Sequence, residues 1–400
     1  MRQVRLLVLI LLVAPLPARA QTLAPAGFSP TAQEVLVRGV TRYAASQPGR
    51  QMVHVARIDA GAAVRIGTGL AFDRVAVPQR EPTSSLCRRM NCLVGVNGDF
   101  FSFETKQPMG GMVDNGVMVR SPSDRVPHLV ETEDGRWRSE PLGWSASVTY
   151  PGADSVPLAG VNITPVPDSV VLYTAHWQAS TSTGSDSAEM TVGLSGPVAP
   201  AQVQALAPRA FTDGVGNAAV PPDGAVLSGH GAGAEALRRL WARMQPSDDP
   251  ASLVEGATRT FTGEGEPKLE LRSQTRVAGV RTVIGGGPVL AADGKVAELP
   301  TSAFSTRRHP RTVVGWNDAG QRWMVTADGR QPGYSEGMTL YEAARFVLDL
   351  GATDVLNLDG GGSTTFVKQG RVVNRPVNGQ PGTERPVANA LLAMATEPLT

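Results

Sequence analysis

Hydrophobic residues in this chain occur mainly in short runs that are separated by polar residues, glycines and prolines. Short apolar runs bounded by turn residues are typical of β-strands. Two turn signals, at residues 114–116 (DNG) and 317–320 (NDAG), lie between such runs and predict β-hairpins. The runs that predict strands lie at residues 52–58, 63–66, 93–96, 112–119, 146–150, 170–174, 189–192, 311–316, 322–328, 355–358, 366–373 and 387–394.

Helical spacing of apolar residues is found in few segments. The strongest covers residues 340–350, where apolar positions repeat every three or four residues. Thr339 just before it and Glu342 in its first turn match a capping box. Weaker patterns predict helices at residues 32–40 and 234–244. Many hairpins with two or three helices indicate an α+β protein, a single mixed, largely antiparallel sheet domain that is covered by a few helices.

The first residues have the pattern of an export signal. Arg2 and Arg5 precede an apolar run at residues 6–13, and residues 18–20 (ARA) match a cleavage site. We therefore expect residues 1–20 to be a signal peptide and the mature protein to be exported, to the periplasm or the extracellular space. No later stretch is long and apolar enough to span a bilayer, so no membrane span is expected.

Beyond residue 20 the chain shows no internal repeat and no low-complexity linker. We interpret residues 21–50 as an N-terminal extension and residues 51–395 as one domain. The formal net charge is +1, 18% of the residues are charged, and no basic block stands out. This composition argues against nucleic acid as a partner.

Cys87 and Cys92 are the only two cysteines of the chain. In an oxidising compartment they could close a small loop as a disulfide, and two free thiols are the alternative. Their spacing alone does not indicate a zinc site, because no second pair of cysteines and no nearby histidine completes it.

Residues 357–365 (NLDGGGSTT) are the most polar glycine-rich segment of the chain. Alternate side chains of a strand share a face, so Asn357 and Asp359 are expected to point with Val355, opposite to Leu356 and Leu358. Glycines let the backbone turn and let a ligand come close. We interpret the segment as part of a binding site, and the alternative is a strand that ends in an ordinary glycine turn.

Three other strand ends run into glycine and polar residues, at residues 97–101, 285–288 and 328–331. Two phenylalanines follow Asp99, which suits a sugar-binding wall or the edge of a core. Arg311, Arg330 and Arg385 lie close to such turns, and a guanidinium suits a phosphate or a carboxylate. For any single arginine, a solvated position or a structural ion pair is the alternative.

Several familiar kinds of site are absent from the sequence. No lysine precedes Ser363 in the frame of a phosphate-binding loop, and Ser363 is not in a G-x-S-x-G nucleophile elbow. No H-E-x-x-H motif or other close histidine spacing indicates a zinc hydrolase.

Together these segments resemble the ordered motif set of the phosphodiester glycosidase family, over residues 50–395. The sequence departs from the family pattern at Asp99, where many relatives carry glycine. The motifs lie at residues 97–101, 284–290, 309–315, 328–331, 337–340, 357–365 and 385–390, with a weaker central part at residues 172–174, 181–183 and Glu189.

The resemblance implies hydrolysis of a sugar-1-phosphodiester at the anomeric carbon, with no cofactor required. A phosphate leaving group is already a stable anion, so its protonation matters less than in ordinary glycosides. The reaction then needs a carboxylate at the anomeric centre and cations at the phosphate. We expect Asp359 to act as base or nucleophile, with Asp328 and Asp99 as further catalytic carboxylates. The expected substrate-binding residues are Asn97, Asn357, Arg311, Arg330, Arg385, Gly286, Gly287, Gly360, Gly361, Gly362, Ser363 and Thr364.

Two other interpretations stay open at this point. The first is a non-catalytic envelope protein that binds glycan in the same pocket. The second is a phosphodiesterase that attacks phosphorus, with Asp99, Asp328 and Asp359 as oxygen ligands of Ca²⁺ or Mg²⁺, although no ligand spacing demands a metal. Sugar phosphates of envelope or extracellular glycans are the expected partners of a hydrolase of either kind.

Overall fold

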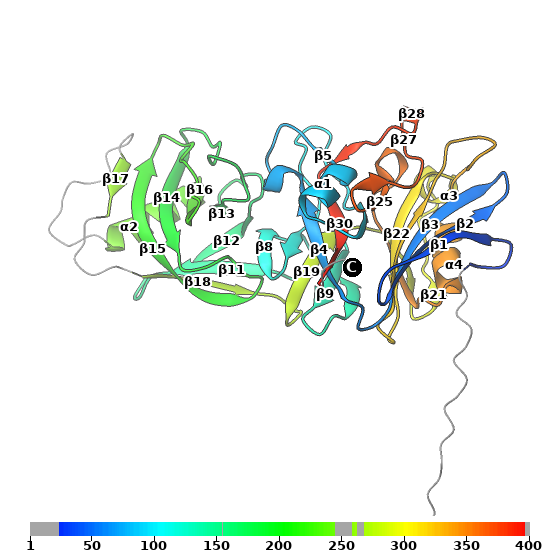
Figure 1. Cartoon of the computed structure of the whole chain (residues 1–400). Helices are drawn as coiled ribbons and strands as arrows, with labels where there is room; N and C mark the ends of the chain where they lie inside the picture. The colour runs from blue at the N-terminus through cyan, green and yellow to red at the C-terminus, as the bar shows by residue number, and fades with distance from the viewer. Residues whose placement is uncertain (1–23, 154, 245–257, 262–267, 397–400) are drawn as a thin grey trace, which may run out of the picture.

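The site segments lie in and around an eight-stranded antiparallel sheet, here called the central sheet (Figure 1). The computed structural model describes residues 24–153, 155–244, 258–261 and 268–396, so the expected signal peptide lies outside the described residues. In spatial order the strands of the central sheet are β1 (Ser29–Val37), β2 (Val40–Gln47), β3 (Gln51–Ile58), β23 (Arg322–Ala327), β22 (Arg311–Trp316), β24 (Asp354–Asn357), β20 (Val289–Ala292) and β21 (Lys295–Val296).

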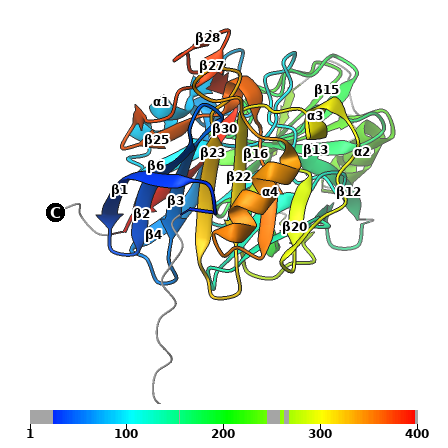
Figure 2. The same cartoon turned by 90° about the vertical axis from the view of Figure 1, so that its right-hand side faces the viewer.

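Helix α4 (Leu340–Asp349) covers one face of the central sheet (Figure 2). The Glu342 backbone N–H donates to Thr339 Oγ1, and the Thr339 N–H donates to Glu342 Oε2, each at 3.0 Å. The predicted capping box is therefore confirmed. Val347 of the helix is buried in one core with Val355 of the sheet, so the helix packs through its predicted apolar stripe.

Two five-stranded antiparallel sheets share a core with the opposite face of the central sheet. Leu356 of β24 is buried there together with Val96 and Ile284. One covering sheet has the order β26 (Arg371–Val372), β25 (Phe366–Lys368), β6 (Val94–Asn97), β30 (Asn389–Ala395) and β4 (Val64–Leu70). The other has the order β10 (Trp137–Glu140), β9 (His128–Thr132), β19 (Val280–Gly285), β7 (Met112–Asp114) and β8 (Val117–Arg120).

A closed seven-stranded barrel forms the other end of the molecule, in green in Figure 1. The ring closes because β14 pairs with both β16 and β15. Helix α2 (Ala232–Met244) adds Leu237 and Trp241 to the barrel core, where Trp241 stacks on Phe211. The ring order is β14 (Ser187–Leu194), β16 (Gly224–His230), β13 (Val170–Thr174), β12 (Val156–Val161), β11 (Ser145–Thr149), β18 (Leu269–Gln274) and β15 (Gln202–Asp213), with β17 (Thr258–Thr260) paired to β15.

The remaining elements are short. Cys87 and Cys92 form a disulfide that joins α1 to the turn after it. The longest described helix, α2, has 13 residues, and within the described residues no helix is long and apolar enough to cross a membrane. The short elements are α1 (Thr83–Arg89), α3 (Ala303–Thr306), the 3₁₀ turns η1 (Ala71–Asp73) and η2 (Gly361–Ser363), and the strand pairs β5 (Glu81–Pro82) with β29 (Pro386–Val387) and β27 (Val377–Asn378) with β28 (Gln380–Pro381).

The fold class expected from the sequence is wrong. Strands hold 45% of the residues and helices 11%, and the strands form several sheets and a barrel instead of one sheet under helices. A pattern of apolar residues indicates that a segment is a strand but not which distant strand it pairs with. The pairing of β11 with β18, which sets Ser147 opposite Arg272, is a pairing of that kind.

The helix expected at residues 32–40 is also wrong, because β1 and β2 occupy this region and belong to the central sheet. The pairing register of β1 with β2 shifts between Thr31 and Glu34, and Ala32 has a φ of 50°. Such an irregularity breaks the strict alternation by which a strand is recognised in a sequence.

The cap of α4 can be tested by Thr339→Ala. Losing the side-chain acceptor leaves the Glu342 N–H without its partner, and we expect unfolding to become easier by about 1 kcal/mol in urea titrations. Thr339→Ser keeps the hydroxyl and is the control, expected within about 0.5 kcal/mol of the parent protein. Equal stability of the alanine variant and the parent protein would show that the cap contributes nothing.

Candidate active site

The ends of β24 and β6 meet at the polar segment 357–365. Leu356 and Leu358 are buried in the core under the covering sheets, whereas Val355 is buried under α4, which confirms the predicted alternation. Beyond β24 the Asp359 N–H donates to the Gly98 carbonyl at 3.0 Å. This bond joins segments that are far apart in the sequence and sets Asp359 beside the stretch that carries Asp99.

Asn97 connects these strand ends through hydrogen bonds of both its side-chain Nδ2 and its side-chain Oδ1. Its Nδ2 donates to the Asp359 carbonyl at 2.6 Å, and its Oδ1 accepts from Thr312 Oγ1 at 2.7 Å and from the Thr365 N–H at 3.1 Å. Asn97 is fully buried. Its role is therefore to hold the backbone of Asp359, while the sequence led us to expect contact with substrate.

Asp99 is a buried carboxylate in a wall of backbone. Its Oδ2 accepts from the Gly110 N–H at 2.6 Å, and its own N–H donates to Asn389 Oδ1 at 2.8 Å. A Cβ on Gly285 would lie 2.5 Å from Asp99 Oδ2, so only glycine fits at that position. Burial, and to a smaller extent the charge of Asp359, raises the pKa of Asp99 to about 7, against the hydrogen bonds from the Gly110 and Phe100 N–H groups and the charge of Arg120.

Asp359 is also a buried carboxyl, and nearby cations and a hydrogen bond offset part of the effect of burial on its pKa. Burial raises its pKa to about 6, against a hydrogen bond from Ser363 and the charges of Arg385 and Arg80. The charge of Asp359 is one of the smaller causes that raise the pKa of Asp99. At neutral pH such a pair can offer one carboxylate and one carboxylic acid, the combination that acid–base chemistry requires.

Arg80 and Arg385 lie near Asp359, and Arg330 lies near Arg385. Burial lowers the pKa of Arg330 and of Arg80, and the charge of Arg385 lowers both further. Among the described residues, none of the three forms an ion pair with a carboxylate, whereas the neighbouring Arg308 pairs with Glu336 and Glu342. Cations that lie close together and unpaired are suited to receive an anionic ligand.

The glycine run makes room for two of these arginines. A Cβ on Gly361, whose φ is +59°, would lie 3.0 Å from Arg330 Nη2, and a Cβ on Gly362 would lie 2.3 Å from Arg385 Nη2. A Cβ on Gly360 would lie 2.9 Å from the Pro310 carbonyl. The glycines thus leave the space that the Arg330 and Arg385 side chains occupy. The next residue, Ser363, accepts a hydrogen bond at its Oγ from Arg385 Nη1 at 3.5 Å.

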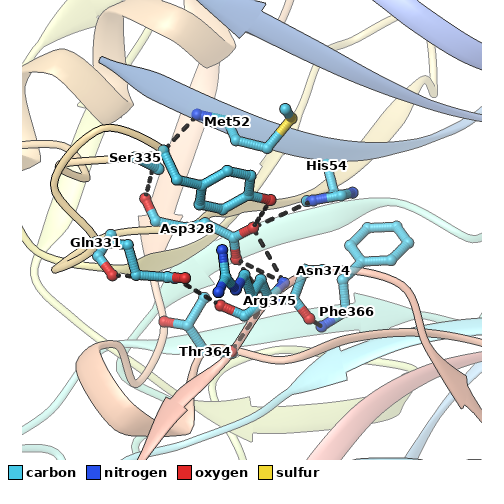
Figure 3. A network of polar contacts seen from close by, with 11 residues as sticks. Met52, His54, Asp328, Gln331, Ser335, Thr364, Phe366, Asn374 and Arg375 are labelled. Atoms are coloured by element: carbon cyan, nitrogen blue, oxygen red, sulfur yellow. Dashed lines mark hydrogen bonds and ion pairs between the residues drawn. The ribbon is translucent and has the colours of Figure 1, made fainter. Parts of the chain in front are cut away.

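Asp328, expected as a catalytic carboxylate, lies in a separate buried network (Figure 3). Its carboxylate accepts from Tyr334 Oη at 2.9 Å, from Asn374 Nδ2 at 2.8 Å and from the Arg375 N–H at 3.1 Å. His54 Nε2 lies 3.4 Å from Asp328 Oδ2. We assign Asp328 to holding the loop that presents Arg330.

Arg330 itself has a left-handed backbone conformation that is uncommon for a non-glycine residue, with a φ of 59°. Its N–H donates to the Glu336 carbonyl at 3.2 Å, and its guanidinium lies 3.4 Å from His309 Nδ1. Burial and the charge of Arg330 lower the pKa of His309, so its neutral imidazole can accept from the guanidinium. Arg330 is thus held in place by neutral groups.

Arg311 was expected at the phosphate but binds backbone. It is 2% exposed, and its guanidinium donates to the carbonyls of Met338, Phe304 and Arg307 at 2.9, 2.5 and 3.0 Å. Burial, and then the charge of Arg330, lowers the pKa of Arg311 to about 10. These contacts fix the segments on either side of the site.

The remaining expected residues line the same turn. Asn357 Nδ2 donates to the Gly287 carbonyl at 2.8 Å, while its Oδ1 is buried without a partner in the described residues. A Cβ on Gly286 would lie 2.7 Å from the Asn357 carbonyl. Thr364 is buried, and its carbonyl accepts from Asn374 Nδ2 at 3.2 Å. These groups join the turn to the Asp328 network and to β24.

Sequence reasoning missed Arg80 and His128. Arg80 lies on no motif, and only the fold brings it to Asp359. His128 Nε2 accepts from the Gly111 N–H at 2.8 Å, and burial lowers its pKa to about 4, so it is neutral beside Asp99. Asn389 was noticed within a motif, but its bond to the Asp99 N–H could not be read from the sequence.

The three aspartates that were considered as metal ligands do not come together. Within the described residues, no group of three or more histidine, cysteine, aspartate or glutamate side chains has the arrangement of a metal site.

Part of the chain matches a known protein family. The phosphodiester glycosidase family model matches residues 212–394, which include Asp328, Asp359 and Arg385. The resemblance seen in the sequence is confirmed over this range. Asp99 and Arg80 lie outside the matched residues.

Two curated proteins match parts of the chain. The N-acetylglucosamine-1-phosphodiester alpha-N-acetylglucosaminidase of Homo sapiens is 39% identical over 66 residues, which are 16% of this chain and 12% of that protein. The SPbeta prophage-derived uncharacterized protein YomE of Bacillus subtilis (strain 168) is 33% identical over 115 residues, which are 28% and 17% of the two chains. The matches thus span less than a fifth of these relatives.

A solved structure supports the fold. The crystal structure of a protein from Burkholderia pseudomallei K96243 has a TM-score of 0.66 at 18% identity, and the match covers 95% of this chain and 99% of that chain. At this identity the similarity shows the fold alone.

The environment of Asp99 has a consequence for stability. Between the ordinary value of 3.8 and about 7 the folded chain keeps a proton that the unfolded chain has released, so wild-type stability falls as pH rises through this window. For Asp99→Asn this loss is absent. Between pH 5 and pH 8 we expect the variant to gain about 2–3 kcal/mol relative to wild type in urea titrations.

The control for this measurement is Asp318→Asn, at an exposed turn. Its stability should follow that of wild type at both pH values. If the difference between Asp99→Asn and wild type were the same at pH 5 and pH 8, the burial argument for Asp99 would be wrong.

Proposed function

We propose that this chain, which carries a phosphodiester glycosidase family domain at residues 212–394, hydrolyses a sugar-1-phosphodiester at the anomeric carbon. One observation carries the proposal: two buried carboxyls, of Asp99 and Asp359, share a site with guanidinium groups that no carboxylate in the described residues neutralises. A neutral glycoside would not need these cations, whereas the phosphate of a sugar-1-phosphodiester would.

In the proposed reaction water adds to the anomeric carbon and the bond from that carbon to the phosphate oxygen breaks. The electron pair of this bond leaves with the phosphate, which becomes a phosphomonoester, and the sugar gains the hydroxyl. Arg385 and Arg330 stabilise the leaving anion, so strong protonation of the leaving oxygen is not required.

Asp359 is the proposed carboxylate of this step. It acts either as the base that takes a proton from water or as the nucleophile that forms a glycosyl-enzyme, which water then opens. Asp99, with its higher pKa, is the group that holds a proton at neutral pH and can exchange it with the leaving oxygen or with water. Proton NMR of the first-formed anomer separates the two routes, since one displacement inverts the configuration and two retain it.

We place the activity outside the cytoplasm, on envelope or extracellular glycans. Two features support this: the export pattern at residues 1–20 and the disulfide between Cys87 and Cys92. Disulfides of this kind persist in oxidising compartments.

The central test is turnover of an N-acetylhexosamine-1-phosphodiester by Asp359→Asn and by wild type. We expect wild type to release free sugar and the variant to lose at least about 100-fold in kcat, because its amide can act neither as base nor as nucleophile. Asp354→Asn, at the start of the same strand, is the matched control and should keep wild-type kcat. A folded Asp359→Asn variant with full activity would refute the assignment.

The same assay run in oxygen-18 water distinguishes the competing functions. Label in the sugar indicates attack at the anomeric carbon, whereas label in the phosphate indicates a phosphodiesterase and would overturn the proposal. Tight glycan binding by wild type without release of sugar would instead identify a glycan-binding protein.

The carboxyl pair also sets a pH dependence. Asp359 must be ionised, so kcat/KM should fall as pH drops through about 6, and Asp99 must hold its proton, so kcat/KM should fall as pH rises through about 7. The expected profile is a bell with its maximum between these values, and Asp99→Asn should lose the alkaline limb. An acid limb near 3.8, the ordinary aspartate value, would contradict the role of Asp359.

A further inference from the structure

Two of the unpaired arginines are held by an aromatic side chain. The Arg80 guanidinium carbon lies 4.3 Å from the ring centre of Phe101 and 5.2 Å from that of Phe103. The Arg385 guanidinium carbon lies 5.5 Å from the Phe103 ring centre. Phe103 therefore contacts both cations. Each contact is a cation–π interaction of ordinary length.

These contacts leave the arginine charges available. Arg80 Nη1 is buried and has no hydrogen-bond partner in the described residues. The hydrogen bonds of Arg385 go to neutral acceptors, Asn378 Oδ1 at 3.1 Å and Ser363 Oγ at 3.5 Å. An aromatic ring orients a guanidinium through its quadrupole and does not neutralise it, in contrast to a carboxylate partner.

The two cations repel each other, and an anion between them would relieve this repulsion. The charge of Arg385 lowers the pKa of Arg80, and the charge of Asp359 acts in the opposite direction. Both guanidinium groups thus lie close to the proposed catalytic carboxyl. The glycine at 362 belongs to the same arrangement, because a side chain there would collide with Arg385.

Phe103 is carried by the loop that also carries Asp99. The loop is closed by the Ser102 N–H, which donates to the Gln107 carbonyl at 2.9 Å, and by the Gly110 N–H, which donates to Asp99 Oδ2. Phe103 itself is 62% exposed, so its ring contributes little to a core. Its contacts with the two arginines are what distinguish it from other exposed apolar residues on the loop, such as Met109.

We propose that Arg80, Phe103 and Arg385 form a subsite for the phosphate that leaves the sugar, in which Phe103 is a positioning residue that keeps both guanidinium groups directed at the anion. This proposal rests on the proposed function for the identity of the anion, a phosphomonoester group. It adds to the reaction a cation, Arg80, and an aromatic residue, neither of which lies in the matched family range.

The direct test uses inorganic phosphate as the probe and calorimetry as the readout, with the full-length protein. Phe103→Leu should weaken phosphate binding about 5- to 30-fold, the effect of losing two cation–π contacts. Phe103→Tyr keeps the ring and should stay within about 2-fold of wild type. Arg80→Gln should weaken binding at least as much as Phe103→Leu does.

The matched control is Met109→Ala, which removes another exposed apolar side chain from the same loop. It should bind phosphate as wild type does. If Phe103→Leu binds phosphate like wild type, or if Phe103→Tyr loses as much as Phe103→Leu, the positioning role of Phe103 is refuted.

Steady-state kinetics on a sugar-1-phosphodiester provide a second readout. For Phe103→Leu we expect kcat/KM to fall by about the factor lost in phosphate affinity, because the same cations bind the phosphate and stabilise it as it leaves. A kcat/KM equal to that of wild type would overturn the proposal.

The two proposals fail separately. If wild type releases no sugar but its phosphate affinity depends on Phe103, the proposed function is wrong and the anion subsite stands. If wild type releases sugar while its phosphate affinity is independent of Phe103, only the subsite is wrong.

Discussion

The site depends on charged groups that lie close together without neutralising one another in direct pairs. An arginine that finds a carboxylate at hydrogen-bond distance is satisfied, as Arg308 is by Glu342. Arg80, Arg330 and Arg385 are held by a phenylalanine ring, a neutral histidine, an asparagine and a serine instead. These neutral partners fix the direction in which each guanidinium points but do not neutralise its charge. The cations therefore repel one another, and their charges remain available to attract an anionic ligand.

Maintaining such an arrangement places demands on the backbone around it. Asp99 needs a bare backbone at Gly285, and Arg385 needs one at Gly362. Asp359 is fixed through its main chain by Asn97, so its carboxyl is not needed as a structural acceptor. The buried hydrogen bonds of Asp328 likewise hold the backbone of the loop that carries Arg330. The rigid sheets supply the anchors, and the reactive groups follow at the ends of β6 and β24.

Local features of the fold could be predicted from the sequence, whereas contacts between distant segments could not. The cap at Thr339, the hairpins at β7–β8 and β22–β23 and the alternation around Leu356 are local patterns, and each was predicted. Asp328 and Asp359 look alike in the sequence, since both follow a strand and precede glycine. Only partners that the sequence does not reveal separate them: Asn374 and Tyr334 donate to the first, while the second lies near the cations Arg80 and Arg385. The barrel and Arg80 depend on the same non-local information, which periodicity does not contain.

The position of Asp99 argues that this arrangement serves chemistry. A carboxyl whose pKa is raised by burial destabilises the folded chain at neutral pH. Replacing this carboxyl by a neutral group would make the folded chain more stable. The chain nevertheless donates to this carboxyl from the Gly110 N–H, holds the Asp99 N–H on Asn389 Oδ1 and leaves room for the side chain at Gly285. The structural carboxylate Glu342 is treated differently: it is partly exposed and paired with Arg308, which lowers its pKa. A buried carboxyl near a second one that has cations beside it is suited to moving a proton, as the proposed hydrolysis requires.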